Sequence, residues 1–144
     1  MARVMFEELG FPIVLVNPPM IRVRGVRVPD VNMRDLQVAV SRQLVTKPAR
    51  LTGAEVRFIR KHYRLRQADL ARVLNMANHS VVSQWEGRED EPSGMEYNTE
   101  VVLRVWMVAR EGIADGLLDL LDGRLKDLAP AMTRPMAVEL PRAA

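Results

Sequence analysis

The sequence predicts a mainly α protein, and two observations support this prediction. Apolar residues recur at helical spacing along most of residues 49–128, whereas the alternation typical of strands is confined to residues 13–28. With 48% hydrophobic and 27% charged residues, the chain has the composition of an ordinary globular protein. We expect three parts: a small β-hairpin and helix unit at 1–48, a five-helix domain at 49–128, and a flexible tail at 129–144.

The N-terminal unit begins with a β-rich segment. Ile13–Val16 is a short apolar run that Asn17-Pro18-Pro19 interrupts, and Met20–Val28 then alternates apolar residues with arginines. Gly25 lies where a turn or bulge would be needed. We therefore expect a meander of two or three strands, which needs another element to pack against.

A helix over Asn32–Val45 is the expected partner of that meander. Apolar side chains recur through it at helical spacing, and either Asp30 or Asn32 can cap its first turn. Lys47-Pro48 ends this helix and, with it, the N-terminal unit.

A helix-turn-helix is predicted immediately afterwards. Thr52 and Glu55 stand three residues apart before an amphipathic stretch, an arrangement in which each side chain satisfies a backbone amide of the other residue. A second helix follows from about Gln67 to Leu74. Its small Ala71 lets a third helix cross closely, and Asn75 tolerates the left-handed backbone that a sharp turn needs.

The third helix, residues 78–87, exposes an uncharged polar surface. Asn78 is its expected cap. If Val82 and Trp85 face the core, the helical step of about 100° per residue turns small and polar side chains outward. Such side chains can contact base edges in the major groove, and a solvated helix surface is the alternative explanation. The outward residues are His79, Ser80, Val81, Ser83 and Gln84.

Basic residues are concentrated on this helix-turn-helix. Residues 50–88 hold eight Arg or Lys against three acidic residues, a net charge of +5. Residues 89–128 hold four basic residues against ten acidic ones, a net charge of −6. A basic segment of this kind can face phosphates, although a solvated charged surface would give the same pattern.

Two further helices complete the predicted five-helix domain. Thr99–Arg110 has apolar side chains on one side, and residues 113–121 repeat that pattern. Part of this apolar stripe is either core or a dimer contact, because a palindromic site on DNA is matched by two-fold protein symmetry. From Pro130 onward three prolines occur in fifteen residues without any period, which predicts the flexible tail.

At these residues the chain resembles the phage repressor and Cro-like (Xre-type) helix-turn-helix regulators. The resemblance covers residues 51–88 and is carried by Arg60, by the stretch Leu65–Ala71 and by Val82–Gly87. It implies a repressor-like helix-turn-helix domain. It also implies a sequence-specific double-stranded DNA-binding transcriptional regulator, a dimeric repressor that inserts helix 78–87 into the major groove.

The resemblance further implies a role for individual residues. Gln67 would cap the second helix against a phosphate, and Arg66 and Arg88 would meet the DNA backbone. An ion pair between Arg60 and Glu86 would tie the first helix to the third and be structural. The residues that would face bases are His79, Ser80 and Gln84.

One departure from the family concerns the turn before the third helix. Residues 75–78 carry one residue more than the usual spacing, and an offset of one position would place Val81 inside. The expected DNA-binding residues are Arg66, Gln67, Asn78, His79, Ser80, Val81, Ser83, Gln84 and Arg88.

A partial likeness to antitoxin regulators of the MqsA/YgiT type gives an alternative function. It is carried by Leu44-Val45-x-Lys47-Pro48 and by Leu51-Thr52-Gly53-x-Glu55. Those proteins bind zinc through N-terminal cysteine pairs, whereas this chain has no cysteine, so its N-terminal unit must be held by its own core. The likeness implies an antitoxin that binds a toxin protein and autoregulates its operon.

The composition argues against several other classes of protein. Without cysteine there is no disulfide, thiolate zinc site or cysteine nucleophile. His62 and His79 lack the spacing of a metal-binding pair, so we expect no metal and no cofactor. No nucleophile stands beside a base and no Gly-rich phosphate loop is present, so we expect no enzyme. No apolar run approaches the roughly 20 residues that span a bilayer, which predicts a cytoplasmic protein with no membrane partner.

Overall fold

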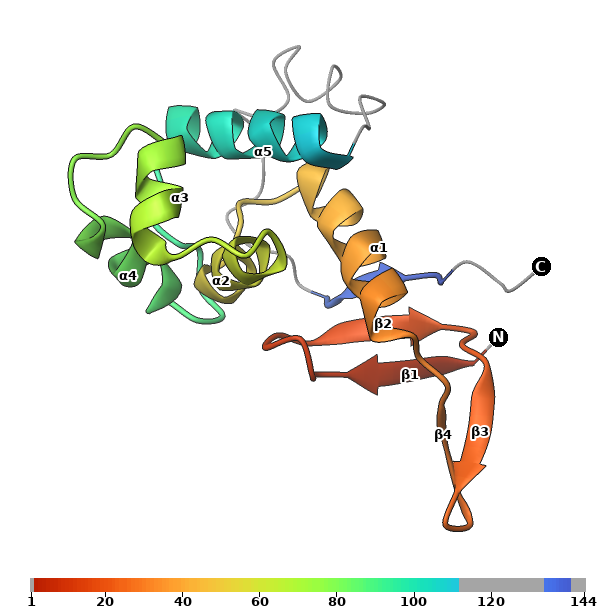
Figure 1. The fold of residues 1–144 in the computed structure, drawn as a ribbon. Helices are drawn as coiled ribbons and strands as arrows, with labels where there is room; N and C mark the ends of the chain where they lie inside the picture. The colour runs from red at the N-terminus through yellow and green to blue at the C-terminus, as the bar shows by residue number, and fades with distance from the viewer. Residues whose placement is uncertain (1, 112–133, 141–144) are drawn as a thin grey trace.

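The computed structural model describes residues 2–111 and 134–140 of the chain (Figure 1). The helix expected around residues 113–121 therefore lies outside the described residues. In chain order the described elements are β1 (Arg3–Phe6), β2 (Ile13–Val16), β3 (Met20–Val23), β4 (Val26–Pro29), α1 (Met33–Val45), α2 (Gly53–His62), α3 (Gln67–Val73), α4 (Ser80–Glu86), α5 (Tyr97–Glu111) and β5 (Met136–Val138).

The fold is mixed α/β, so the prediction of a mainly α protein is wrong. Two small sheets stand beside the helices: a three-stranded sheet in the order β1-β2-β5 and a two-stranded sheet of β3 and β4. The sequence pattern indicates only one hairpin or meander ahead of the helices. Strands β1 and β5 were not predicted, because each is defined by its pairing with β2, a contact that no local pattern in the sequence reveals.

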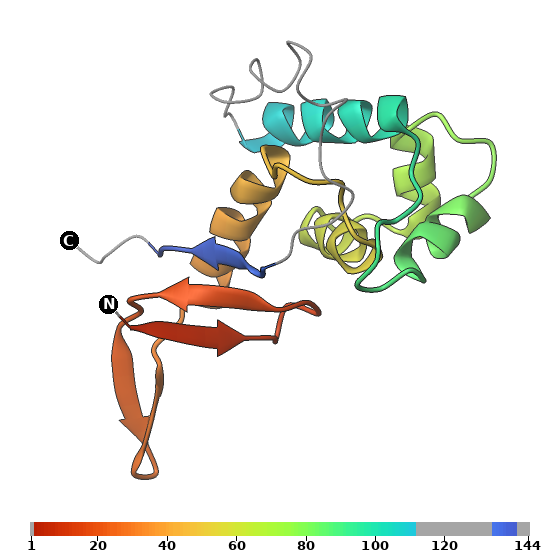
Figure 2. The ribbon, with the colours of Figure 1, turned by 180° about the vertical axis from the view of Figure 1, so that it is seen from behind.

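Strand β5 belongs to the segment that was predicted to be a flexible tail. It runs parallel to β2, with Ile13 opposite Met136 and Leu15 opposite Val138. All four of these side chains are buried, and Figure 2 shows β5 lying alongside β2. The prediction of a flexible tail is therefore wrong for Met136–Val138, because apolar burial and strand pairing hold these residues in place despite the prolines on either side.

The β3–β4 hairpin stands apart from the three-stranded sheet. Asn17, with φ of 51°, and two prolines follow β2, and β2 pairs with β1 and β5 but not with β3. The expected meander is therefore divided between two sheets. Arg24 and Gly25, with φ of 52° and 81°, close the hairpin in the left-handed conformations that a two-residue turn requires. The hairpin projects away from the helices (Figure 1), so it does not pack on α1 as expected.

Helix α1 connects the three-stranded sheet to the other helices. Its cap is Asn32, whose side-chain oxygen accepts the Asp35 amide at 3.1 Å. On its apolar face Leu36, Val40 and Leu44 are fully buried, in a core that also takes in residues of the sheet and of α2 to α5. The N-terminal unit thus shares its core with the predicted helical domain.

Candidate nucleic-acid interface

The first helix of the predicted helix-turn-helix, α2, begins where the sequence indicates. The Thr52 hydroxyl accepts the Glu55 amide at 3.1 Å, and the Glu55 carboxylate accepts the Thr52 amide at 2.9 Å. Lys47 Nζ lies 2.6 Å from the same carboxylate, and both side chains are buried. Glu55 therefore completes the predicted capping box and also pairs with the linker between α1 and α2.

The start of α2 lies directly against the end of α4. The Gly53 amide donates to the Glu91 carbonyl at 3.1 Å, and the Ala54 amide donates to the Glu89 carbonyl at 2.9 Å. A Cβ at Gly53 would lie 2.7 Å from the Glu89 nitrogen and 3.0 Å from the Glu86 oxygen. Only glycine leaves room for this approach, which orients α4 on α2.

Two similar turns join α2 to α3 and α3 to α4. Arg64 and Asn75, the residues after the two helix ends, both have φ of 57°. In the second turn the Met76 amide donates to the Ala71 carbonyl at 2.7 Å, which is the bond of a Schellman motif. The left-handed Asn75 and the buried Ala71 are as predicted. The left-handed conformation of Arg64 was missed, because arginine carries no preference for it.

The residue that immediately precedes α4 is His79, one position after the predicted cap Asn78. Regular helix begins at Ser80, and His79 already has helical φ and ψ of −69° and −15°. The Asn78 side chain accepts the Ser80 amide at 2.9 Å, so Asn78 satisfies an amide of the first turn as an N-cap does.

The register of α4 is set by two buried side chains, Val82 and Trp85. Val81, expected among the outward residues, is half-buried and packs against the core. Its outward placement is therefore wrong, although the predicted register, in which Val82 and Trp85 face the core, is the one observed. The residues that α4 and its cap expose are Asn78, His79, Ser80, Ser83 and Gln84.

The ion pair between Arg60 and Glu86 is formed, as the resemblance implies. Arg60 Nε and Nη2 donate to the two oxygens of Glu86 at 2.7 and 2.9 Å, and Arg60 Nη1 donates to the Leu65 carbonyl at 3.0 Å. Arg57 Nε lies 3.5 Å from the same carboxylate, which is nearly fully buried. Glu86 thus fixes the end of α4 to α2 through two arginines.

The cations beside α4 are already partly neutralised. Arg66 Nε lies 3.1 Å from Asp69 and Arg72 Nη1 lies 3.6 Å from it. The hydrogen bonds from Arg66 lower the pKa of Asp69 to about 2, so this carboxylate stays charged. Gln67, the first residue of α3, is half-buried, and Arg88 is exposed. The net charge of +5 already includes Asp69, and the pairing shows that Arg66 and Arg72 share this one carboxylate.

A buried arginine that the sequence does not single out holds the linker before α2. Arg104 is fully buried and donates to the Val45 and Lys47 carbonyls at 3.2 and 2.7 Å. Its Nη2 lies 3.0 Å from a Glu100 oxygen. Burial lowers the pKa of Arg104, and Glu100 opposes that shift. Arg104 therefore anchors the backbone between α1 and α2 to α5.

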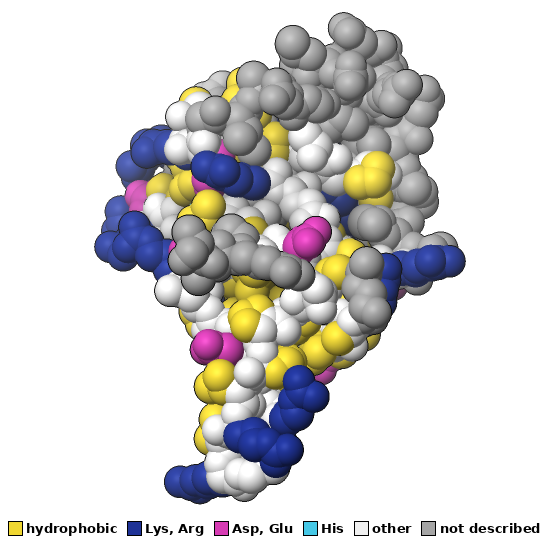
Figure 3. Space-filling view, turned by 90° about the vertical axis from the view of Figure 1, so that its right-hand side faces the viewer, with side chains coloured by type: hydrophobic (Ala, Val, Ile, Leu, Met, Phe, Trp, Pro, Cys, Tyr) yellow, Lys and Arg dark blue, Asp and Glu magenta, His cyan; other side chains and the backbone are white. Residues whose placement is uncertain are grey.

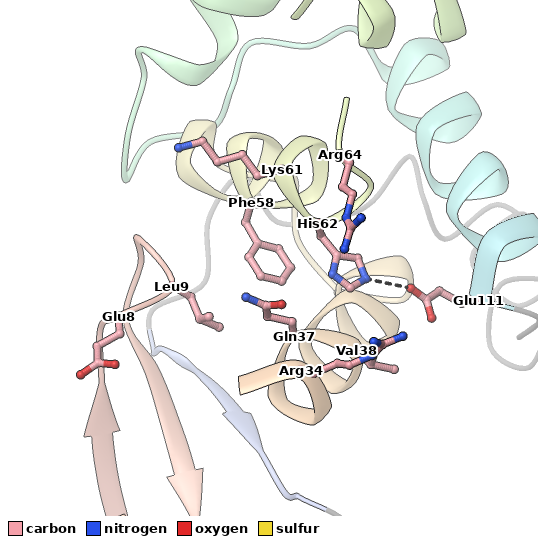
Figure 4. Close-up of a pocket in the computed structure, with 10 residues that line it drawn as sticks. All are labelled: Glu8, Leu9, Arg34, Gln37, Val38, Phe58, Lys61, His62, Arg64 and Glu111. Carbon is pink, nitrogen blue, oxygen red and sulfur yellow. Dashed lines mark hydrogen bonds and ion pairs between the residues drawn. The ribbon is translucent and has the colours of Figure 1, made fainter. Parts of the chain in front are cut away.

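A second polar cluster gathers around Glu111 at the end of α5. Tyr63 and Ser41 donate to Glu111 Oε1 at 2.7 and 3.0 Å, and His62 Nε2 lies 3.3 Å from the same oxygen. Burial alone would raise the pKa of Glu111, but these hydrogen bonds outweigh it and hold the pKa below its ordinary value. His62 and Glu111 line a cavity of about 820 Å³ (Figure 4). The cluster links α1, α2 and α5.

The described residues include neither a cluster suited to a metal ion nor a helix suited to a membrane. Among residues 2–111 and 134–140, no three His, Asp or Glu side chains are grouped as a metal site would need. In the same part of the chain, no helix has the length and apolar character required to cross a bilayer. Comparison with known proteins shows that no family model, curated protein or solved structure matches the chain. Its function must therefore be argued from the residues around α4.

Proposed function

We propose that the chain is a sequence-specific double-stranded DNA-binding transcriptional regulator, a cytoplasmic dimeric repressor that inserts α4 into the major groove. One observation carries the proposal. A Schellman turn fixes the α3–α4 corner and an ion pair fixes α4 to α2, while the face that α4 turns outward holds hydroxyl, amide and imidazole groups and no acidic group. We propose a binding role and no enzymatic one.

A helix that reads bases needs a rigid support and adaptable polar groups. Val82 and Trp85 supply the support because their side chains are buried in the core. The Gln84 amide can pair with the edge of adenine, and the Ser80 and Ser83 hydroxyls can donate to or accept from several bases. Acidic side chains would repel the phosphates on both sides of the groove, and the one acid of α4, Glu86, is buried.

Selection of DNA fragments by the purified chain tests this function. We expect a preferred sequence, and Gln84→Ala should relax the preference at one base pair, because a good side-chain contact to a base contributes about 1–3 kcal/mol of discrimination. Asn98→Ala, which removes an exposed amide from α5, is the matched control and should change nothing. Absence of binding to any duplex at low salt would refute the proposal.

The dimer is supported by an apolar surface on α5. Leu103 and Met107 of this helix are buried in the core, whereas Val102 and Val105 are 48% and 44% exposed. A second copy placed on these valines would bury them and present two α4 helices to a palindromic site. Val102→Asp should convert the dimer to monomer in sedimentation velocity and weaken binding to two half-sites more than to one. A wild-type monomer at concentrations that saturate DNA would contradict the dimer.

A further inference from the structure

The β3–β4 hairpin is a basic arm that has no role in the proposed contact between α4 and DNA. Its ten residues, Met20–Pro29, include Arg22, Arg24 and Arg27 and no acidic residue. All three arginines are exposed, and none forms an ion pair with any residue that the structure describes. Figure 3 shows Lys and Arg side chains gathered on the projecting arm at the bottom of the view.

Two of these arginines face each other across the hairpin. In the register of β3 and β4, Arg22 is directly opposite Arg27, so both side chains lie on the same face. Like charges in this position destabilise a pair of strands. Two-stranded hairpins are also marginally stable on their own, so a repulsive pair is costly here unless an anion lies between the two side chains.

The other face of the hairpin is apolar. The opposite pairs there are Ile21 with Val28 and Val23 with Val26. Ile21, Val23 and Val26 are 44%, 48% and 62% exposed, so the described part of the chain leaves this face largely uncovered. The hairpin is therefore an exposed ribbon with an apolar face, a cationic face and Arg24 at its tip.

The charge balance around α4 favours DNA as the partner of this ribbon. Arg57, Arg60 and Arg66 are paired with acidic side chains. The exposed cations of residues 51–88 that form no ion pair within the described part of the chain are Lys61, Arg64 and Arg88. A DNA-binding protein obtains most of its salt-dependent affinity from such cations. The three exposed arginines of the hairpin would double the number of such cations.

We propose that the β3–β4 hairpin is a second DNA contact, in which Arg22, Arg24 and Arg27 bind backbone phosphates outside the base pairs read by α4. The inference rests on the proposed function of α4. Because the arm projects away from the helices (Figure 1), it lengthens the protected stretch of DNA without adding to base preference. An anionic lipid surface is the other partner with suitable charge, but the arm has no Trp or Tyr of the kind that anchors proteins at such surfaces.

The test is a triple variant designed to keep the hairpin folded. Arg22→Thr and Arg27→Thr retain residues that favour strands. Arg24→Asn places the preferred Asn-Gly pair in the turn, where the backbone of residue 24 is left-handed. The charge-preserving control changes the same three arginines to lysine. Circular dichroism and thermal melting verify that both variants fold.

The measurements are the salt dependence of DNA affinity and a hydroxyl-radical footprint. Loss of three phosphate contacts should reduce the slope of log K against log salt by about 2.7, so that the wild type loses about 40-fold more affinity than the variant between 50 and 200 mM salt. Backbone protection beyond the bases read by α4 should disappear. The base preference should remain, and the lysine control should keep the wild-type slope.

The two proposals can fail separately. A wild type that selects a DNA sequence but shares its salt slope and footprint with the triple variant overturns the hairpin contact alone. A wild type that binds no duplex at low salt overturns both. Vesicles containing phosphatidylserine serve as a third test. The proposal would also be overturned if the vesicles bind the wild type but not the triple variant, while the salt dependence of DNA affinity is the same for both.

Discussion

Replacing Gly53 with alanine should push α4 away from α2 and lower the free energy of unfolding. The added Cβ would lie 2.7 Å from the Glu89 nitrogen and 3.0 Å from the Glu86 oxygen, and closer still to the Trp85 oxygen. Ordinary contacts of a Cβ begin at about 3.4 Å, and every atom in the way belongs to the backbone. The helices must therefore separate by several tenths of an ångström or more.

The magnitude follows from two opposing effects. Overpacking of this kind costs about 1–3 kcal/mol. In the opposite direction, replacing glycine with alanine raises the free energy of unfolding by about 0.4–1 kcal/mol, because alanine restricts the backbone of the unfolded chain. A net loss of about 1–2 kcal/mol remains, which corresponds to a fall in Tm of roughly 3–7 °C for a chain of this size.

Urea unfolding of Gly53→Ala beside Gly87→Ala measures the effect. Gly87 is the matched control because it also belongs to the helix-turn-helix and has φ of −68°, which any residue adopts. The nearest atom to a Cβ at Gly87 is the Ser83 oxygen at 3.3 Å, so its substitution should leave the free energy of unfolding unchanged or raise it by up to about 1 kcal/mol. Equal stability of the two variants would refute the close approach of α2 and α4.

Two further predictions concern buried carboxylates. Glu86→Gln should destabilise the fold by about 3 kcal/mol, because it leaves Arg60 without its charged partner. The double variant Arg60→Met with Glu86→Leu should recover most of that loss in the same urea assay, because it removes both charges. Glu111→Gln should cost about 1–3 kcal/mol at pH 7. Since the folded pKa of Glu111 lies below its ordinary value of 4.5, the stabilisation by its carboxylate is present above that pH and is lost as the pH falls through the folded pKa. The difference in Tm between wild type and Glu111→Gln should therefore narrow below pH 4.5, and a constant difference down to pH 3 would contradict the role of the charge.

Local interactions were the part of this molecule that could be predicted from the sequence. The Thr52–Glu55 capping box, the cap Asn32, the hydrogen bond from the Ser80 amide to Asn78 and the left-handed Asn75 each depend on residues within a few positions of one another. Their outcome is decided by short-range sterics and hydrogen bonding, which a pattern of residue types captures.

Contacts between distant residues were the part that could not be predicted. Strand β5 is recognisable only through its pairing with β2, and the approach of Gly53 to α4 only through the packing of two helices. The candidate site gives a similar example, the ion pair of Arg66 with Asp69. A count of charges in the sequence does not reveal which cations are already neutralised by such pairs. Val81 is half-buried because it packs against the core, a tertiary contact that the helical step alone does not reveal.

The parallel pairing of β5 with β2 determines where this chain can be shortened. Residues 129–144 invite removal because of their prolines, but a chain ending at Ala129 would lose Met136 and Val138 from the core. It would also leave β2, whose Ile13 and Leu15 are fully buried, with an open hydrogen-bonding edge. Exposed apolar edges of this kind recruit strands from other molecules. Shortened forms of the protein should therefore retain the chain through Leu140 if they are to stay monodisperse.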